Sequence, residues 1–215
     1  MKTPLKTLFL MLLAGGLVAG LGGAARGADT GFHITFKQGT MDATANDETL
    51  FTKLEAEHGK LQNGRQVNPM GVELDFLMFT GPHSGVGFGV ESTQYQKTFQ
   101  FRGSGLPVED LSLSARSLIY TLKMYARLGT LYPYLALGSG NYYIRYTEKT
   151  GNVSFLDSAP RVLTGRVGFR WMWGAIGIMA EGGQTLATLP VRTRTDRATV
   201  ELGGAFVQTG ITLGW

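Results

Sequence analysis

Three histidines are the residues of this sequence that could serve as a catalytic base. His83 is followed directly by Ser84, and a hydroxyl beside an imidazole is the start of a nucleophile–base pair. His33 begins an alternating stretch, and His58 precedes a glycine. Each also has a simpler interpretation: His83 as a turn residue, His33 as an inward strand residue and His58 as the end of a helix. The elements that carry the histidines decide between these interpretations.

Other binding chemistry has weaker support. The glycines of "GVGFGV" alternate within a strand pattern, whereas a dinucleotide-binding fingerprint opens a helix after a strand. No histidine or carboxylate spacing is typical of a structural metal site. The chain also contains no cysteine, which excludes disulfides and acylation on cysteine. We therefore expect no cofactor, no metal and no catalytic residues.

Charged residues stand in the middle of alternating stretches, among glycines, rather than in loops. Five are basic and four acidic: Lys37, Glu73, Asp75, Glu91, Lys123, Arg127, Arg166, Arg170 and Glu181. The face opposite to them is almost purely apolar. If the charged face lined a narrow interior, near-balance would let the charges pair, because an unpaired buried charge is very costly.

Eight stretches alternate with period 2, which predicts eight β-strands. They are "GFHITFK", "MGVELDFLMF", "GVGFGVESTQY", "SLIYTLKMYAR", "YPYLALGSG", "LTGRVGFRW", "AIGIMAEGG" and the last ten residues, 206–215. Period 2 alone also fits a soluble sandwich. The connections favour another architecture, since they alternate between long (39–68, 97–111, 147–160 and 189–197) and short (81–84, 128–131 and 173–174).

Alternating loop lengths are typical of an up-and-down barrel in an outer membrane, with short periplasmic turns and longer outer loops. Charged residues make up 17% of the chain, against about 25% in an average soluble protein. The sequence thus predicts an all-β fold, an eight-stranded antiparallel transmembrane β-barrel with apolar residues towards lipid. A barrel of this size is filled by its own side chains.

The first 27 residues have the pattern of a secretory signal peptide. Lys2 and Lys6 precede an apolar run from Leu8 to Leu21, and small residues follow. The alternative, a membrane anchor, would need about 20 apolar residues. Removal leaves residues 28–215 as one barrel domain, with 17 basic residues against 16 acidic, a net charge of +1. That balance argues against nucleic-acid binding.

The first long loop contains a predicted amphipathic helix in "NDETLFTKLEAEHGK". Asn46 or Asp47 would cap its start, and Gly59 would end it. Its apolar stripe, Phe51 and Leu54 with Leu50, could pack on the barrel mouth. The alternative is that loop 39–68 binds a surface partner, as amphipathic helices do in grooves.

At this point the chain resembles the small eight-stranded outer-membrane barrels of Gram-negative bacteria, the OmpA/OmpX-like group. "YPYLALGSGNYY" is similar to that group's fifth strand, "TGRVGFRW" to its sixth and "IMAEGGQT" to its seventh. "FVQTGITLGW" resembles the carboxyl-terminal insertion signal, carried by Phe206, Ile211, Leu213 and Trp215. Gly182 and Gly183 depart from the group, which has aromatic and basic residues there.

The resemblance implies export to the cell outer membrane, contact with its lipid and recognition by the barrel-insertion machinery. It also implies a non-enzymatic role in envelope structure or surface interaction. A narrow pore or conduit for small molecules is the alternative. A lipid A-modifying enzyme is a third, but His83 is expected at the periplasmic end, away from lipid A in the outer leaflet.

Overall fold

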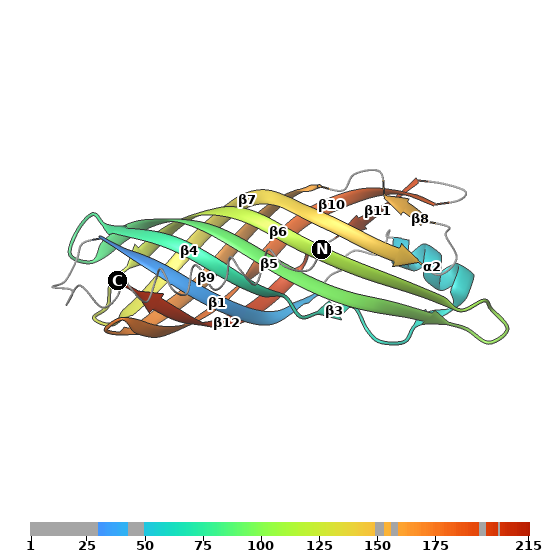
Figure 1. Cartoon of the computed structure of the whole chain (residues 1–215), viewed down its shortest axis with the longest axis horizontal. Helices are drawn as coiled ribbons and strands as arrows, with labels where there is room; N and C mark the ends of the chain where they lie inside the picture. The colour runs from blue at the N-terminus through green and yellow to red at the C-terminus, as the bar shows by residue number, and fades with distance from the viewer. Residues whose placement is uncertain (1–29, 43–49, 149–152, 156–158, 194–196, 202) are drawn as a thin grey trace, which may run out of the picture.

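The computed structural model describes residues 30–42, 50–148, 153–155, 159–193, 197–201 and 203–215. Within them the chain forms an elongated β-barrel with one short helix at one end (Figure 1). Its wall consists of eight strands: β1 (Thr30–Asp42), β4 (Met70–Phe79), β5 (Ser84–Arg102), β6 (Glu109–Ala126), β7 (Leu131–Glu148), β9 (Arg161–Trp173), β10 (Ile176–Thr193) and β12 (Ala205–Gly214). The predicted fold class is confirmed.

Closure is completed by the first and last strands. Every wall strand pairs antiparallel with its neighbour, and β12 pairs with β1 over nine positions, from His33–Gly214 to Met41–Phe206. The backbones of Phe32 and Trp215 add two hydrogen bonds of 3.0 Å beyond that register. Over the levels where all eight wall strands pair, the closed ring leaves no free strand edge, which is the condition for strands to lie in lipid.

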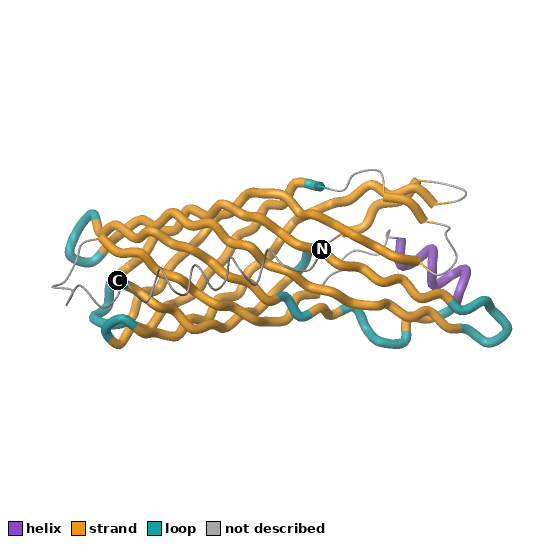
Figure 2. The backbone as a smooth tube through the Cα atoms, in the orientation of Figure 1, coloured by secondary structure: helices purple, strands orange, loops and turns teal. Residues whose placement is uncertain are grey.

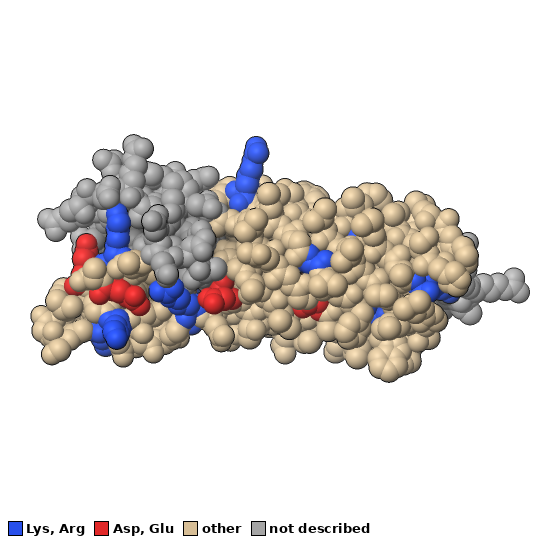
Figure 3. Space-filling model, turned by 180° about the vertical axis from the view of Figure 1, so that it is seen from behind, with Lys and Arg blue, Asp and Glu red and all other residues tan. Residues whose placement is uncertain are grey.

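The outside of the barrel carries large apolar side chains. Phe88 on β5, Leu137 on β7 and Val167 on β9 are 58%, 71% and 60% exposed. They alternate with inward residues because successive side chains of a strand point to opposite faces. Figure 3 shows the consequence on one face, where charged side chains gather at the end that carries the helix and are sparse elsewhere.

Short turns close the end of the barrel where the chain reaches Trp215. The connections there are residues 80–83, 127–130 and 174–175, close to the short connections predicted from the sequence. Gly129 and Gly174 adopt positive φ angles of 65° and 63°. Only glycine does so without strain, so these two residues allow the tight reversals (Figure 2).

At the other end the strands run further than predicted. The connection expected at 97–111 is only residues 103–108, because β5 extends to Arg102 and β6 begins at Glu109. The direction of alternation is unchanged there, but the residue types are exchanged. The inward residues are now apolar, such as the buried Phe99 and Phe101, and the outward residues are polar, such as the exposed Thr98. A prediction that follows one continuous apolar face therefore ends the strand too early.

The other long connections contain short strands that the sequence did not predict. These are β2 (Lys60–Leu61) paired with β5, β3 (Gln66–Val67) with β1, and both β8 (Val153–Phe155) and β11 (Arg197–Glu201) with β10. The predicted bounds of the last connection, 189–197, are also wrong, because β10 continues to Thr193 and β12 begins at Ala205. Backbone pairing rather than apolar alternation creates these extensions.

The predicted helix is present as α2 (Leu50–His58). Gly59 ends it with a φ of +92°, and its amide donates to the Glu55 carbonyl at 3.0 Å. Phe51 packs edge-on against Phe99, with ring centroids 4.8 Å apart, and is 1% exposed. The apolar stripe thus packs into the barrel mouth. Its expected caps, Asn46 and Asp47, lie outside the described residues.

The predicted signal peptide, residues 1–27, also lies outside the described residues. Among the described residues, no helix has the length and hydropathy that crossing a membrane requires.

We predict that the protein is heat-modifiable. A closed ring of backbone hydrogen bonds has no edge at which unfolding can begin, so it should stay folded in unboiled detergent samples. Boiled and unboiled samples should therefore migrate differently on a gel, and circular dichroism should show strand only before boiling. Identical migration without a strand signal would contradict the closed barrel.

Candidate functional site

The interior of the barrel contains a cluster of ionised side chains, which we call the lumen network. Its members come from six strands and are at most 6% exposed. They are Lys37 (β1), Glu73 and Asp75 (β4), Glu91 (β5), Lys123 (β6), Arg166 and Arg170 (β9) and Glu181 (β10). The register of each strand directs these residues inward, while the neighbouring apolar residues face out.

Lys37 lies at the centre of one half of the network. Its ammonium nitrogen is 2.8 Å from Glu73 Oε2, 2.8 Å from Glu91 Oε2 and 2.9 Å from Glu181 Oε1. The guanidinium of Arg166 also forms ion pairs with Glu91 and Glu181, the latter at 3.3 Å. Two cations thus hold three carboxylates from three different strands.

Asp75 is the centre of the other half. Its Oδ2 atom lies 3.0 Å from Lys123 Nζ and 3.1 Å from Arg170 Nη2, and it accepts a hydrogen bond of 2.7 Å from the Tyr125 hydroxyl. Lys123 is also 2.8 Å from Glu73, which joins the two halves. The result is one continuous network of four cations and four anions with no net charge.

Hydroxyl groups add hydrogen bonds to the carboxylates. Tyr134 donates to Glu181 Oε2 at 2.7 Å, and Thr93 donates to Glu91 Oε1 at 2.7 Å. Buried charges are tolerated when they are both paired and hydrogen-bonded. These hydroxyls occupy inward positions of the same alternation as the charges, but alternation alone does not predict which carboxylates they contact.

Glycines leave the room that the network occupies. A Cβ atom on Gly89 would lie 2.6 Å from the Thr121 hydroxyl and 2.9 Å from Asp75 Oδ1. One on Gly87 would lie 2.8 Å from the Tyr125 ring. The glycines of "GVGFGV" thus face a crowded lumen, where a larger residue would displace a network member.

Apolar layers cover the network at both ends of the barrel. Towards the short turns, Leu77 packs with Tyr125, Tyr134 and Ala136. Towards the helix, a larger cluster fills the mouth and takes in Phe51 and Leu54 of α2 together with Met41, Val67, Tyr95, Phe99, Phe101, Leu111, Leu113, Ala115, Ile119, Tyr142, Val162, Ala187 and Phe206. The network therefore lies between two apolar layers.

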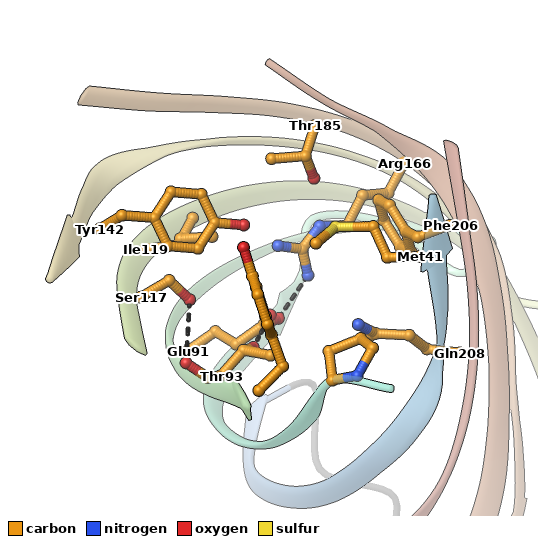
Figure 4. A pocket seen from close by; sticks show the side chains of 12 residues that line it. Met41, Glu91, Thr93, Ser117, Ile119, Tyr142, Arg166, Thr185, Phe206 and Gln208 are labelled. Carbon is orange, nitrogen blue, oxygen red and sulfur yellow. Dashed lines mark hydrogen bonds and ion pairs between the residues drawn. The ribbon is translucent and has the colours of Figure 1, made fainter. Parts of the chain in front are cut away.

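A cavity of about 20 Å³ remains between the network and the mouth cluster (Figure 4). Glu91 and Arg166 line it on the side of the network, and Tyr142 points into it from β7. Tyr95 and Gln208 each have a buried oxygen without a hydrogen-bond partner among the described residues. This volume accommodates about one water molecule.

Arg127 is the one predicted network residue that the structure places elsewhere. It follows the end of β6, and its guanidinium lies 5.1 Å from the centre of the Phe79 ring. Its backbone amide donates to the His83 carbonyl at 2.9 Å. Among the described residues no carboxylate pairs with it. The prediction was wrong because the strand ends one residue before Arg127, which puts its side chain at the rim.

The three histidines have different surroundings in the structure. His33 Nδ1 is 3.2 Å from Arg170 Nη1, and His58 Nδ1 is 3.0 Å from the Pro107 carbonyl oxygen. His83 is exposed in the turn before β5. No hydroxyl is a hydrogen-bond partner of these rings in the described part of the chain. The described residues also contain no group of three metal-ligating side chains.

The four residues of the predicted insertion signal face different surroundings. Phe206 points inward, and the Arg166 guanidinium lies 5.7 Å from the centre of its ring. Ile211 is 57% exposed on the outer face, Leu213 is partly buried and Trp215 is exposed beside the short-turn rim. Three of the four thus lie on or near the apolar outer surface.

Comparison with solved structures agrees with this architecture. The outer membrane protein OprG from Pseudomonas aeruginosa matches with a TM-score of 0.55 and 13% identity, over 86% of this chain and 95% of that one. Ail of Yersinia pestis (TM-score 0.41, 15% identity, 86% and 97% covered) and AlkL (0.44, 14%, 90% and 93%) are also similar. No protein-family model and no curated protein sequence matches. The chain thus has the fold of a small outer-membrane β-barrel.

We predict that replacing Arg166 by leucine destabilises the barrel. The change leaves Glu91 and Glu181 with Lys37 as their shared cation, and breaking a buried pair costs about 3–5 kcal/mol. Arg170→Leu, which removes a cation from Asp75, should act in the same direction. Urea unfolding of the refolded protein measures the free energy of unfolding.

Arg127→Leu is the matched control, because it removes the same charge outside the network and should cost less than about 1 kcal/mol. The double variant Arg166→Leu/Glu91→Gln restores charge balance and should recover part of the loss. Equal stability of the Arg166→Leu and Arg127→Leu variants would show that the network does not hold the barrel together.

Proposed function

We propose that this protein is a non-enzymatic β-barrel of the bacterial outer membrane with a closed lumen, serving envelope structure or surface interaction. The exposed apolar wall and the closed ring of paired strands in the described part of the chain support the membrane location. The sequence motifs of β7, β9, β10 and β12 suggest that it is of the OmpA/OmpX-like type. Residues 1–27 would direct its export as a signal peptide.

The lumen network is the observation that carries this proposal. Eight charges with mutual contacts of about 3 Å fill the lumen in the described part of the chain, and an apolar layer covers them at each end. A conducting pore needs a hydrated lumen, as in the larger porins. The narrow-conduit alternative is supported less, since the cavity beside the network measures about 20 Å³.

A surface role is supported by the long strands at the helix end. β5, with 19 residues, and β6, with 18, exceed the 9–11 residues that a tilted strand needs to span a bilayer. The excess raises their connecting loop, residues 103–108, well above the apolar wall (Figure 1). Because the stripe of α2 is already buried, a partner would contact the polar residues of the first loop rather than this stripe.

We predict that the purified protein does not form large, steady channels. Reconstitution into planar bilayers should give no single-channel steps of the kind that an open lumen produces, because ions would have to cross the paired charges and both apolar layers. Arg166→Leu should raise conductance if the network is the barrier, and Arg127→Leu should not. Large, stable currents from the wild type would favour the pore instead.

We also propose that the barrel-insertion machinery reads the carboxyl-terminal strand, with Trp215 as part of the signal. The backbone of Trp215 makes two hydrogen bonds to Phe32, and its side chain lies at the interface rim. A chain that ends at Gly214 should therefore accumulate in the periplasm or be degraded. It should still fold in detergent, since burying one aromatic side chain contributes only about 1.5–3 kcal/mol.

Fractionation of the envelope measures this effect, and Trp215→Phe is the control because it keeps an aromatic ring at the rim. If the truncated chain reaches the outer membrane as well as the wild type does, Trp215 is not part of an insertion signal.

A further inference from the structure

The outer face of β6 and its neighbours changes character at one level of the barrel. On β6, the outward side chains Leu122 and Tyr120 are 48% and 61% exposed and apolar or aromatic. Above them, Arg116 and Ser114 are exposed and polar. The same wall thus passes from a surface suited to lipid to one suited to water, and Arg116 stands at the boundary.

Three outward arginines meet at this boundary around one tyrosine. Arg116 on β6 is the direct cross-strand partner of Tyr143 on β7, and Arg145 lies two residues further along β7. Arg161 on β9 pairs with Asn141, two residues from Tyr143 on its other side. Each of these three arginine positions therefore lies about 5–8 Å from the position of Tyr143. We call Arg116, Arg145, Arg161 and Tyr143 the arginine patch.

The height of the patch matches the edge of a bilayer. Arg116 is 10 residues from Ala126, where β6 ends at the short-turn rim, and Arg161 is 12 residues from Trp173. With a rise of about 3.3 Å per residue and a tilt of about 40°, these separations correspond to about 25 and 30 Å. The apolar band of outer-membrane barrels is about 25 Å tall, so the patch falls in the headgroup region.

No described carboxylate forms an ion pair with the three arginines. Arg116 donates only to the Ser92 hydroxyl, at 3.3 Å, on the exposed face. Arg102, higher on β5, instead has an acidic partner, since its Nη1 atom lies 3.1 Å from Asp110 Oδ1. The positive charge of the patch is thus uncompensated by the part of the chain that the structure describes.

The three arginines of the patch lie on adjacent strands, β6, β7 and β9. At the corresponding level of other strands, the described outward residues include the uncharged Gln38, Gln94 and Gln184. Asp42, on β1, is acidic, and β1 stands four strands from β7 in either direction around the barrel. A general attraction to an anionic surface would not require three arginines on adjacent strands.

We infer that the arginine patch binds the phosphate group of a phosphorylated lipid in the surrounding outer leaflet. Guanidinium groups bind phosphate through paired hydrogen bonds, and the tyrosine ring sits at the level of the headgroup. The acyl chains of that lipid would lie along the apolar wall below, over Tyr120 on β6 and Leu163 on β9, which is 56% exposed. This inference rests on the membrane location proposed above.

The test uses the full-length mature protein in nanodiscs of phosphatidylcholine that contain a small fraction of lipid A. After release, native mass spectrometry counts the lipid A molecules that remain bound. The variant Arg116→Gln/Arg145→Gln/Arg161→Gln is compared with Lys60→Gln/Arg102→Gln/Arg127→Gln, which removes three positive charges elsewhere. Retention should fall about tenfold or more in the first variant and little in the control.

Dephosphorylated lipid A separates recognition of the phosphate from recognition of the acyl chains, and wild-type protein should retain it no better than phosphatidylcholine. Gel mobility before and after boiling establishes that each variant is folded. If the triple variant does not fold, the double variant Arg145→Gln/Arg161→Gln takes its place in the comparison. Equal retention by wild type and patch variants, or of both forms of lipid A, would overturn the inference. Failure of the wild type to enter nanodiscs would overturn the membrane location as well.

Discussion

The pairing of Lys37 with three carboxylates is the interaction on which the rest of the structure depends. A barrel of eight strands is too narrow to hydrate its interior fully, so each inward charge must find an opposite charge within the lumen. Lys37 meets that requirement for Glu73, Glu91 and Glu181 at once, and so connects β1 to β4, β5 and β10. The glycines of β5, the tyrosine hydroxyls and the two apolar layers all serve to accommodate or enclose this group.

The barrel contains two environments stacked along its axis. In the lower part, apolar side chains such as Phe88 point out and charges point in. In the upper part, Phe99 and Phe101 point in and polar residues point out, as in a soluble protein. The strand backbone is continuous through the change, so the side chains alone determine where lipid ends. The arginine patch lies at that transition.

Alternation and loop lengths were sufficient to predict the strand number, the closed barrel and the inward direction of the charges. They also predicted the helix, because Phe51, Leu54 and Gly59 have helical spacing and a stop signal. They could not predict that β5 reaches Arg102, since the apolar face changes sides near the bilayer boundary. Nor could they separate Arg127 from the network, because one residue at a strand end decides whether a side chain faces the lumen or the rim. Alternation could not predict hydrogen bonds such as that from Tyr134 to Glu181, because it shows the direction of a side chain and not its partner.

The separation of the network residues along the chain has a consequence for assembly. Lys37 and Glu181 are 144 positions apart in the sequence, and their contact requires one strand from the early part of the chain and one from the late part. Contacts of such long range form late, since the entropy of closing the intervening loop must be overcome first. Pairs such as Lys37–Glu73 join adjacent strands and can form in an open sheet, whereas Lys37–Glu181, Arg166–Glu91 and Arg170–Asp75 form only as the ring closes. These three long-range pairs thus stabilise the completed barrel specifically.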